Sequence, residues 1–244
     1  MRLFAELLSR LLFTPGRNAK LALLEGYFTT APDPDRGWAL AALSGGIDLP
    51  NVTPSRIRGL VEERVDPVLF RLSYDYVGDL AETVALIWPE QNVTRADPPR
   101  LGEVVDLLQS TGRGALGTVL TRLFDSLEAS ERLALIKLCT GGLRVGVSAR
   151  LARVALSRAS GRPIERIEEL WFGVAPPYES LFAWLDGGAE PAVDLALSFR
   201  PMMLANPVEE HLGKLDPADY GAEWKWDGIR VQAVAMGGER RLYS

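Results

Sequence analysis

Residues 135–148 read LIKLCTGGLRVGVS, and they decide the fold of most of the chain. An apolar helical stretch, 131–139, leads into the paired glycines Gly141 and Gly142. A second helical stretch, 149–159, follows Ser148, which is well placed to cap it. Because glycine commonly ends a helix and serine commonly starts one, the segment predicts a helix, a short glycine-rich loop and a second helix.

The same helical pattern recurs on both sides of this segment. Apolar residues at intervals of three and four predict further helices at 3–13, 57–65, 77–88, 101–108 and 116–127. The pairs Asp33-Pro34 and Asp66-Pro67 each combine an N-cap residue with proline at the first helical position, so they predict helix starts. We expect residues 1–190 to form an all-helical domain.

Composition excludes several classes of protein. The 244 residues include one cysteine, Cys139, and one histidine, His211. This excludes an internal disulfide and a zinc site made of several cysteines or histidines. Cys139 lies in an apolar run and is expected to be a buried structural thiol. No apolar run is long enough to cross a membrane, so we expect a cytoplasmic protein with no membrane partner.

The net charge of −5 hides a basic segment. Residues 137–166 contain seven lysines and arginines and one acid, a local charge of +6, which leaves −11 for the rest of the chain. Arginine suits phosphate oxygens, and a local basic patch is typical of nucleic-acid contact. The candidate DNA-binding residues are Lys137, Arg144, Arg150 and Arg153. Alternatively, the glycines only end a helix and the arginines only cover a solvated surface.

The composition changes after a glycine-rich linker at 187–191, and β-favouring residues begin near Trp224. Residues 223–230 read EWKWDGIR. If this segment is extended, Lys225 shares one face with Glu223 and Asp227, and both tryptophans share the other face and pack inward. Gly237-Gly238 then predicts a two-residue hairpin turn between strands at 230–235 and 240–243.

Lys225 is a candidate nucleophile. A lysine attacks only as the neutral amine, so a site must lower its pKa from about 10.4 by desolvation or by neighbouring cations. An ionised Asp227 would oppose that shift, so we expect it instead to orient the amine or a bound metal. The alternative is a solvated charged face on a surface hairpin.

The spacing Glu-x-Lys-x-Asp-Gly-x-Arg resembles the active-site motif of covalent nucleotidyltransferases, the superfamily of DNA ligases, RNA ligases and mRNA-capping enzymes. Residues 77–84, 135–148 and 200–205 are similar to segments of ATP-dependent DNA ligases that carry a helical DNA-binding domain before the catalytic core. Residues 27–43 resemble the bacterial branch of that group.

The resemblance implies a role for each motif residue. Lys225 would form a lysyl-AMP intermediate from ATP, with Mg²⁺ as the accompanying ion. Glu223 and the backbone near Trp224 would contact the adenosine, and Arg230 would contact the ribose or the nearby part of the nucleotide. The partner would be nicked duplex DNA, and we expect a monomer.

The resemblance also implies a domain order. The fold class is mainly α, with a helical DNA-binding domain at 1–190 followed at 191–244 by a linker and the first strands of an α/β nucleotidyltransferase (adenylation) domain. Further motifs follow the hairpin in the ligases that the chain resembles, so we expect it to be part of a longer enzyme. Two alternatives stay open: an RNA ligase or capping-type enzyme, and a helical DNA-binding module without catalysis.

Overall fold

A computed structural model of the chain describes residues 1–90, 97–193, 197–200, 213, 215–221, 223–224, 226–229 and 231–243. It divides into two compact units. The first consists of residues 1–164 and 175–191, and the second of residues 165–174 and 192–244. Each unit is described by itself, and the domain boundary expected at residue 190 stays a prediction.

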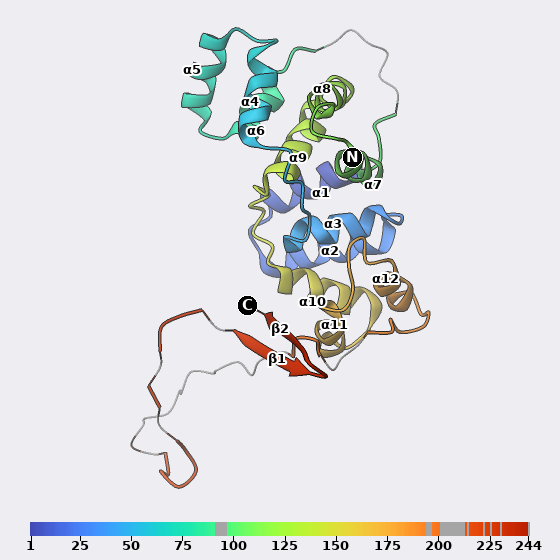
Figure 1. The fold of residues 1–244 in the computed structure, drawn as a ribbon, viewed down its shortest axis with the longest axis vertical. Helices are drawn as coiled ribbons and strands as arrows, with labels where there is room; N and C mark the ends of the chain where they lie inside the picture. Colours follow the sequence, from blue (N-terminus) through green and yellow to red (C-terminus); the bar gives the residue numbers. More distant parts are fainter. Residues whose placement is uncertain are drawn as a thin grey trace. The chain divides into compact units, whose positions relative to one another are not determined.

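The first unit is helical throughout its regular structure, as Figure 1 shows. Its helices are α1 (Arg2–Leu12), α2 (Arg17–Thr30), α3 (Asp35–Ser44), α4 (Pro54–Glu62), α5 (Pro67–Val77), α6 (Leu80–Ile87), α7 (Leu101–Ser110), α8 (Leu116–Ser126), α9 (Ala129–Thr140), α10 (Ala149–Ser160) and α12 (Glu179–Leu185). The predicted mainly α fold is confirmed. None of the described helices is long and apolar enough to span a bilayer.

Two helices organise the packing of the first unit. Helix α9 packs against α1 and α6, and α10 packs against α2 and α3. Leu21 and Leu24 of α2 are fully buried, as are Ala152 and Ala155 of α10. Because the alanine side chains are short, the axes of α10 and its neighbours can approach closely. The loop between α9 and α10 is therefore attached at both ends to the core of the unit.

Side-chain caps start several helices, as the sequence predicts. Asp66 Oδ1 accepts the N–H groups of Val68 at 2.8 Å and of Leu69 at 2.9 Å, and Pro67 occupies the first position of α5. Ser148 Oγ likewise accepts the Leu151 N–H at 3.1 Å and caps α10. These bonds satisfy backbone donors that have no partner inside the helix.

Replacing Asp66 by alanine should lower the free energy of unfolding by about 1 kcal/mol, because both N–H groups lose their acceptor. Urea unfolding followed by circular dichroism would measure the change. Asp66→Asn keeps an acceptor and should cost less. Equal losses for the two variants would show that the cap bond is not the cause.

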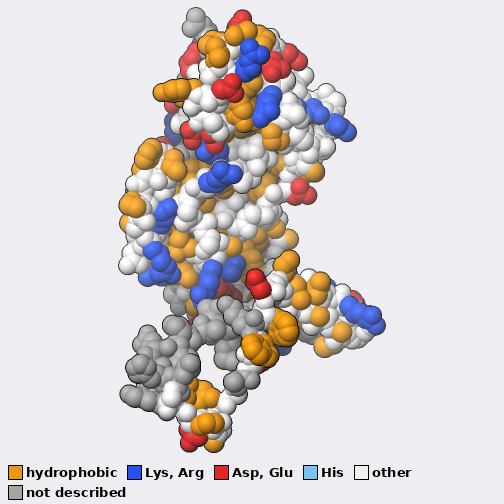
Figure 2. Space-filling model, turned by 90° about the vertical axis from the view of Figure 1, so that its left-hand side faces the viewer, with side chains coloured by type: hydrophobic (Ala, Val, Ile, Leu, Met, Phe, Trp, Pro, Cys, Tyr) orange, Lys and Arg blue, Asp and Glu red, His pale blue; other side chains and the backbone are white. Residues whose placement is uncertain are grey.

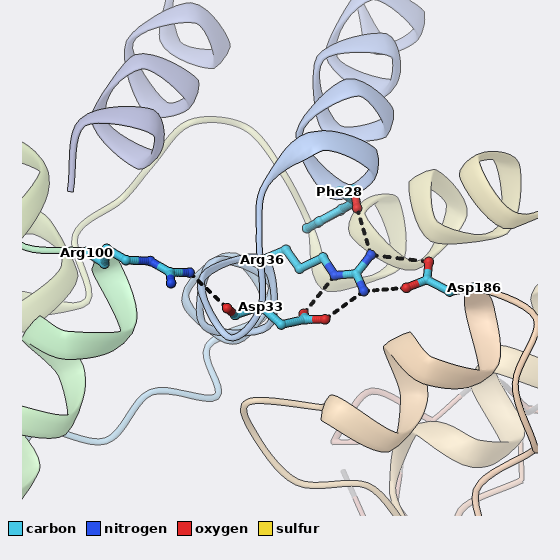
Figure 3. A network of polar contacts seen from close by, with 5 residues as sticks. All are labelled: Phe28, Asp33, Arg36, Arg100 and Asp186. Carbon is cyan, nitrogen blue, oxygen red and sulfur yellow. Dashed lines mark hydrogen bonds and ion pairs between the residues drawn. The ribbon is translucent and has the colours of Figure 1, made fainter.

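Asp33 does not cap a helix, contrary to the sequence prediction. Helix α3 begins at Asp35, its N-cap residue is Pro34, and that cap makes no side-chain hydrogen bond. The Asp33 carboxylate instead accepts two hydrogen bonds at 2.8 Å from the guanidinium of Arg36, which Asp186 binds from the opposite side (Figure 3). A buried guanidinium requires such partners, and here two carboxylates supply them.

The helix predicted at 77–88 is found as α6 at 80–87, and only Val77 of the predicted range belongs to the preceding helix. Helix α5 ends at Val77, and Gly78 follows with φ 74°, the left-handed conformation that favours glycine. Asp79 then caps α6 by accepting the N–H of Glu82 at 2.9 Å. The chain reverses at Gly78, and α5 packs against α6.

The second unit contains α11 (Ile164–Trp171), most of which belongs to it, and one antiparallel hairpin. Strands β1 (Gln232–Met236) and β2 (Glu239–Tyr243) pair with Met236 opposite Glu239. The connecting Gly237 and Gly238 have φ values of 59° and 87°. Two positive φ values are what a two-residue hairpin loop requires, so the predicted turn is confirmed.

An aromatic cluster holds the hairpin to the rest of this unit. The ring of Phe172 lies 4.6 Å from that of Phe199 and 5.3 Å from that of Tyr243, centroid to centroid. The Tyr243 hydroxyl also donates a hydrogen bond to the carbonyl of Leu197. An isolated two-stranded hairpin is marginal in water, so these contacts stabilise it.

The extended segment predicted at 223–227 does not form a strand at its described positions. Residues 223, 224, 226 and 227 have no regular structure, and the side chains of Trp224 and Trp226 are 86% and 84% exposed. The prediction that these rings pack inward is therefore wrong for this structure. Among the described residues, no helix or further strand covers these two tryptophan rings.

Candidate nucleic-acid interface and nucleotide motif

The connection between α9 and α10 is a tightly folded loop. Gly141 ends α9 with φ 68°, and the N–H of Gly142 donates to the carbonyl of Lys137 at 3.0 Å. Arg144 and Gly146 also have positive φ values, 43° and 66°. Arginine seldom adopts this conformation, so the surrounding contacts must hold Arg144 in it.

A buried lysine of α2 supplies one such contact. Lys20 is 9% exposed, and its Nζ donates to the carbonyl of Val145. A Cβ at position 146 would lie 2.6 Å from that Nζ, so a larger residue would force the lysine to shift, and the φ of 66° also favours glycine there. The loop is thus fixed from the protein interior, on the residue next to Arg144.

Arg144 and Arg150 are the two predicted DNA contacts that the structure leaves exposed. Arg144 lies in the loop, and Arg150 lies in the first turn of α10, directly after the Ser148 cap. The face in Figure 2 shows lysine and arginine side chains spread along the helical part, with acidic side chains gathered mainly near its upper end. The geometry of these two arginines is compatible with contact to a phosphate backbone.

Lys137 has a different environment from the exposed arginines. Its side chain is 13% exposed, and its ammonium lies 3.5 Å from Asp79 Oδ2 and 3.3 Å from Glu82 Oε1. Two carboxylates therefore offset its charge. Lys137 joins the end of α9 to the start of α6. This favours a role in holding the two helices together over direct contact with DNA.

Arg153 is half-buried and lies near the hydroxyl of Tyr178. Burial raises the pKa of Tyr178, and a hydrogen bond to Ser44 and the positive charge of Arg153 oppose that rise. A guanidinium in this environment has less access to a large ligand than Arg144 or Arg150. Its predicted DNA contact stays a prediction.

Three further positive residues of the basic segment also have protein partners. In the first unit, Arg158 lies 3.5 Å from Glu25, and Arg162 donates to the carbonyl of Trp184 at 3.2 Å. In the second unit, Arg166 pairs with Glu169. The charge of +6 counted along the sequence is therefore not one free positive surface.

The nucleotide motif is only partly described. Lys225 and Arg230 lie outside the described residues. Glu223 and Trp224 are described, and both are exposed. The roles of these residues in binding ATP stay predictions.

The described residues contain no group of three or more His, Cys, Asp or Glu side chains that could hold a metal ion. The expected Mg²⁺ stays a prediction. Cys139 also gives no reactive site, because burial raises the pKa of its thiol to about 12. A thiol with that pKa stays protonated at neutral pH, which agrees with the structural role predicted for it.

The chain is similar in sequence to proteins that are named DNA ligases. It is 32% identical over 151 residues to a probable DNA ligase of Anaeromyxobacter dehalogenans, over 59% of this chain and 29% of that protein. It is 28% identical over 240 residues to a probable DNA ligase of Streptomyces griseus, over 95% of this chain and 42% of that protein.

An archaeal relative has the same name. A DNA ligase of Haloarcula marismortui is 28% identical over 153 residues, which cover 58% of this chain and 27% of that protein. No protein-family model matches the chain. The chain spans less than half the length of the relatives it matches, and the resemblance to DNA ligases is confirmed as sequence similarity.

Proposed function

We propose that the chain carries the DNA-gripping part and the nucleotide-accepting lysine of an ATP-dependent DNA ligase. Residues 1–190 hold duplex DNA around a nick, and residues 191–244 begin the nucleotidyltransferase domain. One observation carries the proposal. The sequence EWKWDGIR at 223–230 occurs in the same chain as a helical part that is similar to proteins named DNA ligase.

In the proposed reaction, the neutral amine of Lys225 attacks the α-phosphorus of ATP. A phosphorus–nitrogen bond forms, the bond from the α-phosphorus to the bridging oxygen breaks, and pyrophosphate leaves while the amine gives up a proton. The AMP then passes to the 5′-phosphate at the nick, and the 3′-hydroxyl displaces it. Glu223 and the backbone near Trp224 contact the adenosine, and Arg230 contacts the ribose or the nearby part of the nucleotide.

The proposal includes Mg²⁺ as the ion that accompanies the phosphates of ATP. The described residues provide no cluster of ligands for it, so no step is assigned to the ion. The proposal also keeps the expected monomer, acting in the cytoplasm on nicked duplex DNA.

The DNA-gripping half is supported by the α9–α10 loop. Arg144 is exposed within a loop that Lys20 fixes from the interior, and Arg150 is exposed in the first turn of the helix that follows it. Charges held in place by a rigid scaffold lose little conformational entropy when they bind a polymer. Contacts of this kind position a duplex and do not depend on its sequence.

The 244-residue chain should bind duplex DNA, with an affinity that falls steeply as salt rises. The variant Arg144→Ala/Arg150→Ala should flatten the slope of log K against log salt by nearly two units, because each phosphate contact contributes about 0.9. Fluorescence anisotropy at four or more salt concentrations measures the slope. Arg10→Ala/Arg17→Ala, which removes two other exposed arginines, is the matched control. Equal slopes in the two folded double variants would assign the DNA contacts to other residues.

Nick sealing tests the whole proposal. The complete gene product should join a nicked DNA duplex with ATP and transfer labelled AMP first to itself and then to the nick. Sealing confined to RNA would instead support an RNA ligase. Duplex binding without any AMP transfer would support a helical DNA-binding module that does no chemistry.

A further inference from the structure

An open polar cleft lies in the first unit, beside the α9–α10 loop. It has a volume of about 330 Å³ and is formed by α4, the turn between α5 and α6, and the end of α9. Residues that line it include Arg58, Tyr74, Asp79, Lys137, Thr140 and Arg144. The cleft thus brings a residue of α4 together with a loop that lies more than eighty positions later in the chain.

The charges around the cleft leave a positive excess. Three lining residues are cations, namely Arg58, Lys137 and Arg144, and one is an acid, Asp79. Asp79 already faces the Lys137 ammonium at 3.5 Å, and its other oxygen caps α6. Among the described residues, neither Arg58 nor Arg144 has a carboxylate partner, so their charges are available to a ligand.

Both available cations are held in place. The Arg58 guanidinium lies 4.9 Å from the centre of the Tyr74 ring and donates to the Tyr74 hydroxyl at 3.1 Å. The backbone of Arg144 has a φ of 43°, and the carbonyl of the next residue, Val145, accepts a hydrogen bond from buried Lys20. A cation stacked on an aromatic ring keeps most of its remaining N–H groups free to donate.

The chemistry of the cleft favours, as its ligand, an anionic group that belongs to a long polymer over a small molecule. Sites for small molecules are usually enclosed and mostly apolar, whereas this cleft is open and polar. Tyr74 already stacks with Arg58, so the two arginines are the main groups that the cleft presents to a ligand. Two guanidinium groups with no carboxylate partner match the oxygens of a phosphodiester.

We propose that this cleft binds a phosphodiester of the DNA backbone through Arg58 and Arg144, which extends the DNA-binding surface from the α9–α10 loop onto α4. This inference rests on the proposed function, because it assigns a second contact to the same duplex. Tyr74 is a positioning residue that orients the Arg58 guanidinium.

The test measures duplex affinity of the 244-residue chain against salt for single variants. Arg58→Ala should weaken binding about 5- to 10-fold at 0.1 M salt and flatten the log–log slope by nearly one unit, as the loss of one phosphate contact predicts. Arg58→Lys keeps the charge and should keep most of the slope. Tyr74→Phe keeps the ring and should weaken binding by less than Arg58→Ala. Arg122→Ala, which removes an exposed arginine of α8 outside the cleft, is the matched control and should change neither quantity.

The outcomes distinguish failure of this inference from failure of the proposed function. If Arg58→Ala leaves affinity and slope at the values of Arg122→Ala while Arg144→Ala/Arg150→Ala lowers both, Arg58 is not a DNA contact, the inference is wrong and the ligase proposal stands. If the unmodified chain binds no duplex, both proposals fail. If Arg58→Ala abolishes competition by inorganic phosphate but leaves the salt slope unchanged, the cleft takes a free anion and the inference is wrong. Thermal unfolding of each variant confirms that it is folded.

Discussion

Replacing Lys225 by arginine should abolish the transfer of labelled AMP from ATP to the complete gene product, with a fall of at least about a thousandfold in the rate of adduct formation. Arginine keeps the positive charge at position 225, but its guanidinium stays protonated and gives no free amine to attack the α-phosphorus. Gel autoradiography after incubation with ATP labelled at the α-phosphate measures the adduct, and mass spectrometry locates it.

A second lysine provides the control for this experiment. Lys214→Arg changes another lysine of the same segment, one that lacks the Lys-x-Asp-Gly-x-Arg context, and should leave adduct formation unchanged. Label that persists in Lys225→Arg would disprove the assignment of the nucleophile. Loss of label in both variants would mean that the substitutions disturb the domain as a whole.

Local rules predicted those parts of the fold that depend on neighbours in sequence. Ser148 and Asp66 cap helices because their oxygens reach N–H groups two or three residues away. Gly237 and Gly238 form a hairpin turn because glycine alone adopts both positive φ values without strain. Each of these features is decided within about five residues, so a pattern in the sequence is sufficient to find it.

Long-range partners explain where the same rules failed. Asp33 has the pattern of a helix cap, but Arg36 binds its carboxylate together with Asp186, which lies 150 positions after Arg36. Helix α2 was not predicted, and one of its residues, Lys20, is a buried cation bound to a carbonyl of a distant loop. Neither contact leaves a periodic signal in the local sequence.

The candidate DNA-binding surface also depends on long-range contacts that the local sequence does not reveal. Counting charge along the chain selected residues 137–166, where Arg144 and Arg150 are exposed but Lys137 is held by two acids. Arg58 was missed because it precedes that segment by about eighty positions and reaches the cleft only through the packing of α4. A linear count of charge registers neither ion pairs nor residues that folding brings together.

Replacing Arg132 by alanine should reduce the free energy of unfolding by about 3–5 kcal/mol, which is large against the stability of a typical domain. Arg132 is 1% exposed in α9. Its guanidinium donates to the carbonyls of Phe124 at 3.0 Å and Leu127 at 2.9 Å, at the end of α8, and of Ala85 at 2.8 Å, near the end of α6. One side chain thus caps the carboxyl ends of two helices, which otherwise present carbonyls without partners.

Alanine at position 132 would leave those three carbonyls buried without donors and would open a cavity beside them, and both effects destabilise the folded state. Urea unfolding should show the loss as a lower midpoint with an unchanged slope. Arg132→Lys restores a charge but has no planar fork, so it should recover only part of the stability. Arg122→Ala removes an exposed arginine and should stay within about 0.5 kcal/mol of the unmodified chain. A loss below about 1 kcal/mol for Arg132→Ala would mean that water replaces the guanidinium at the helix ends, and that α9 does not join α6 and α8 through this residue.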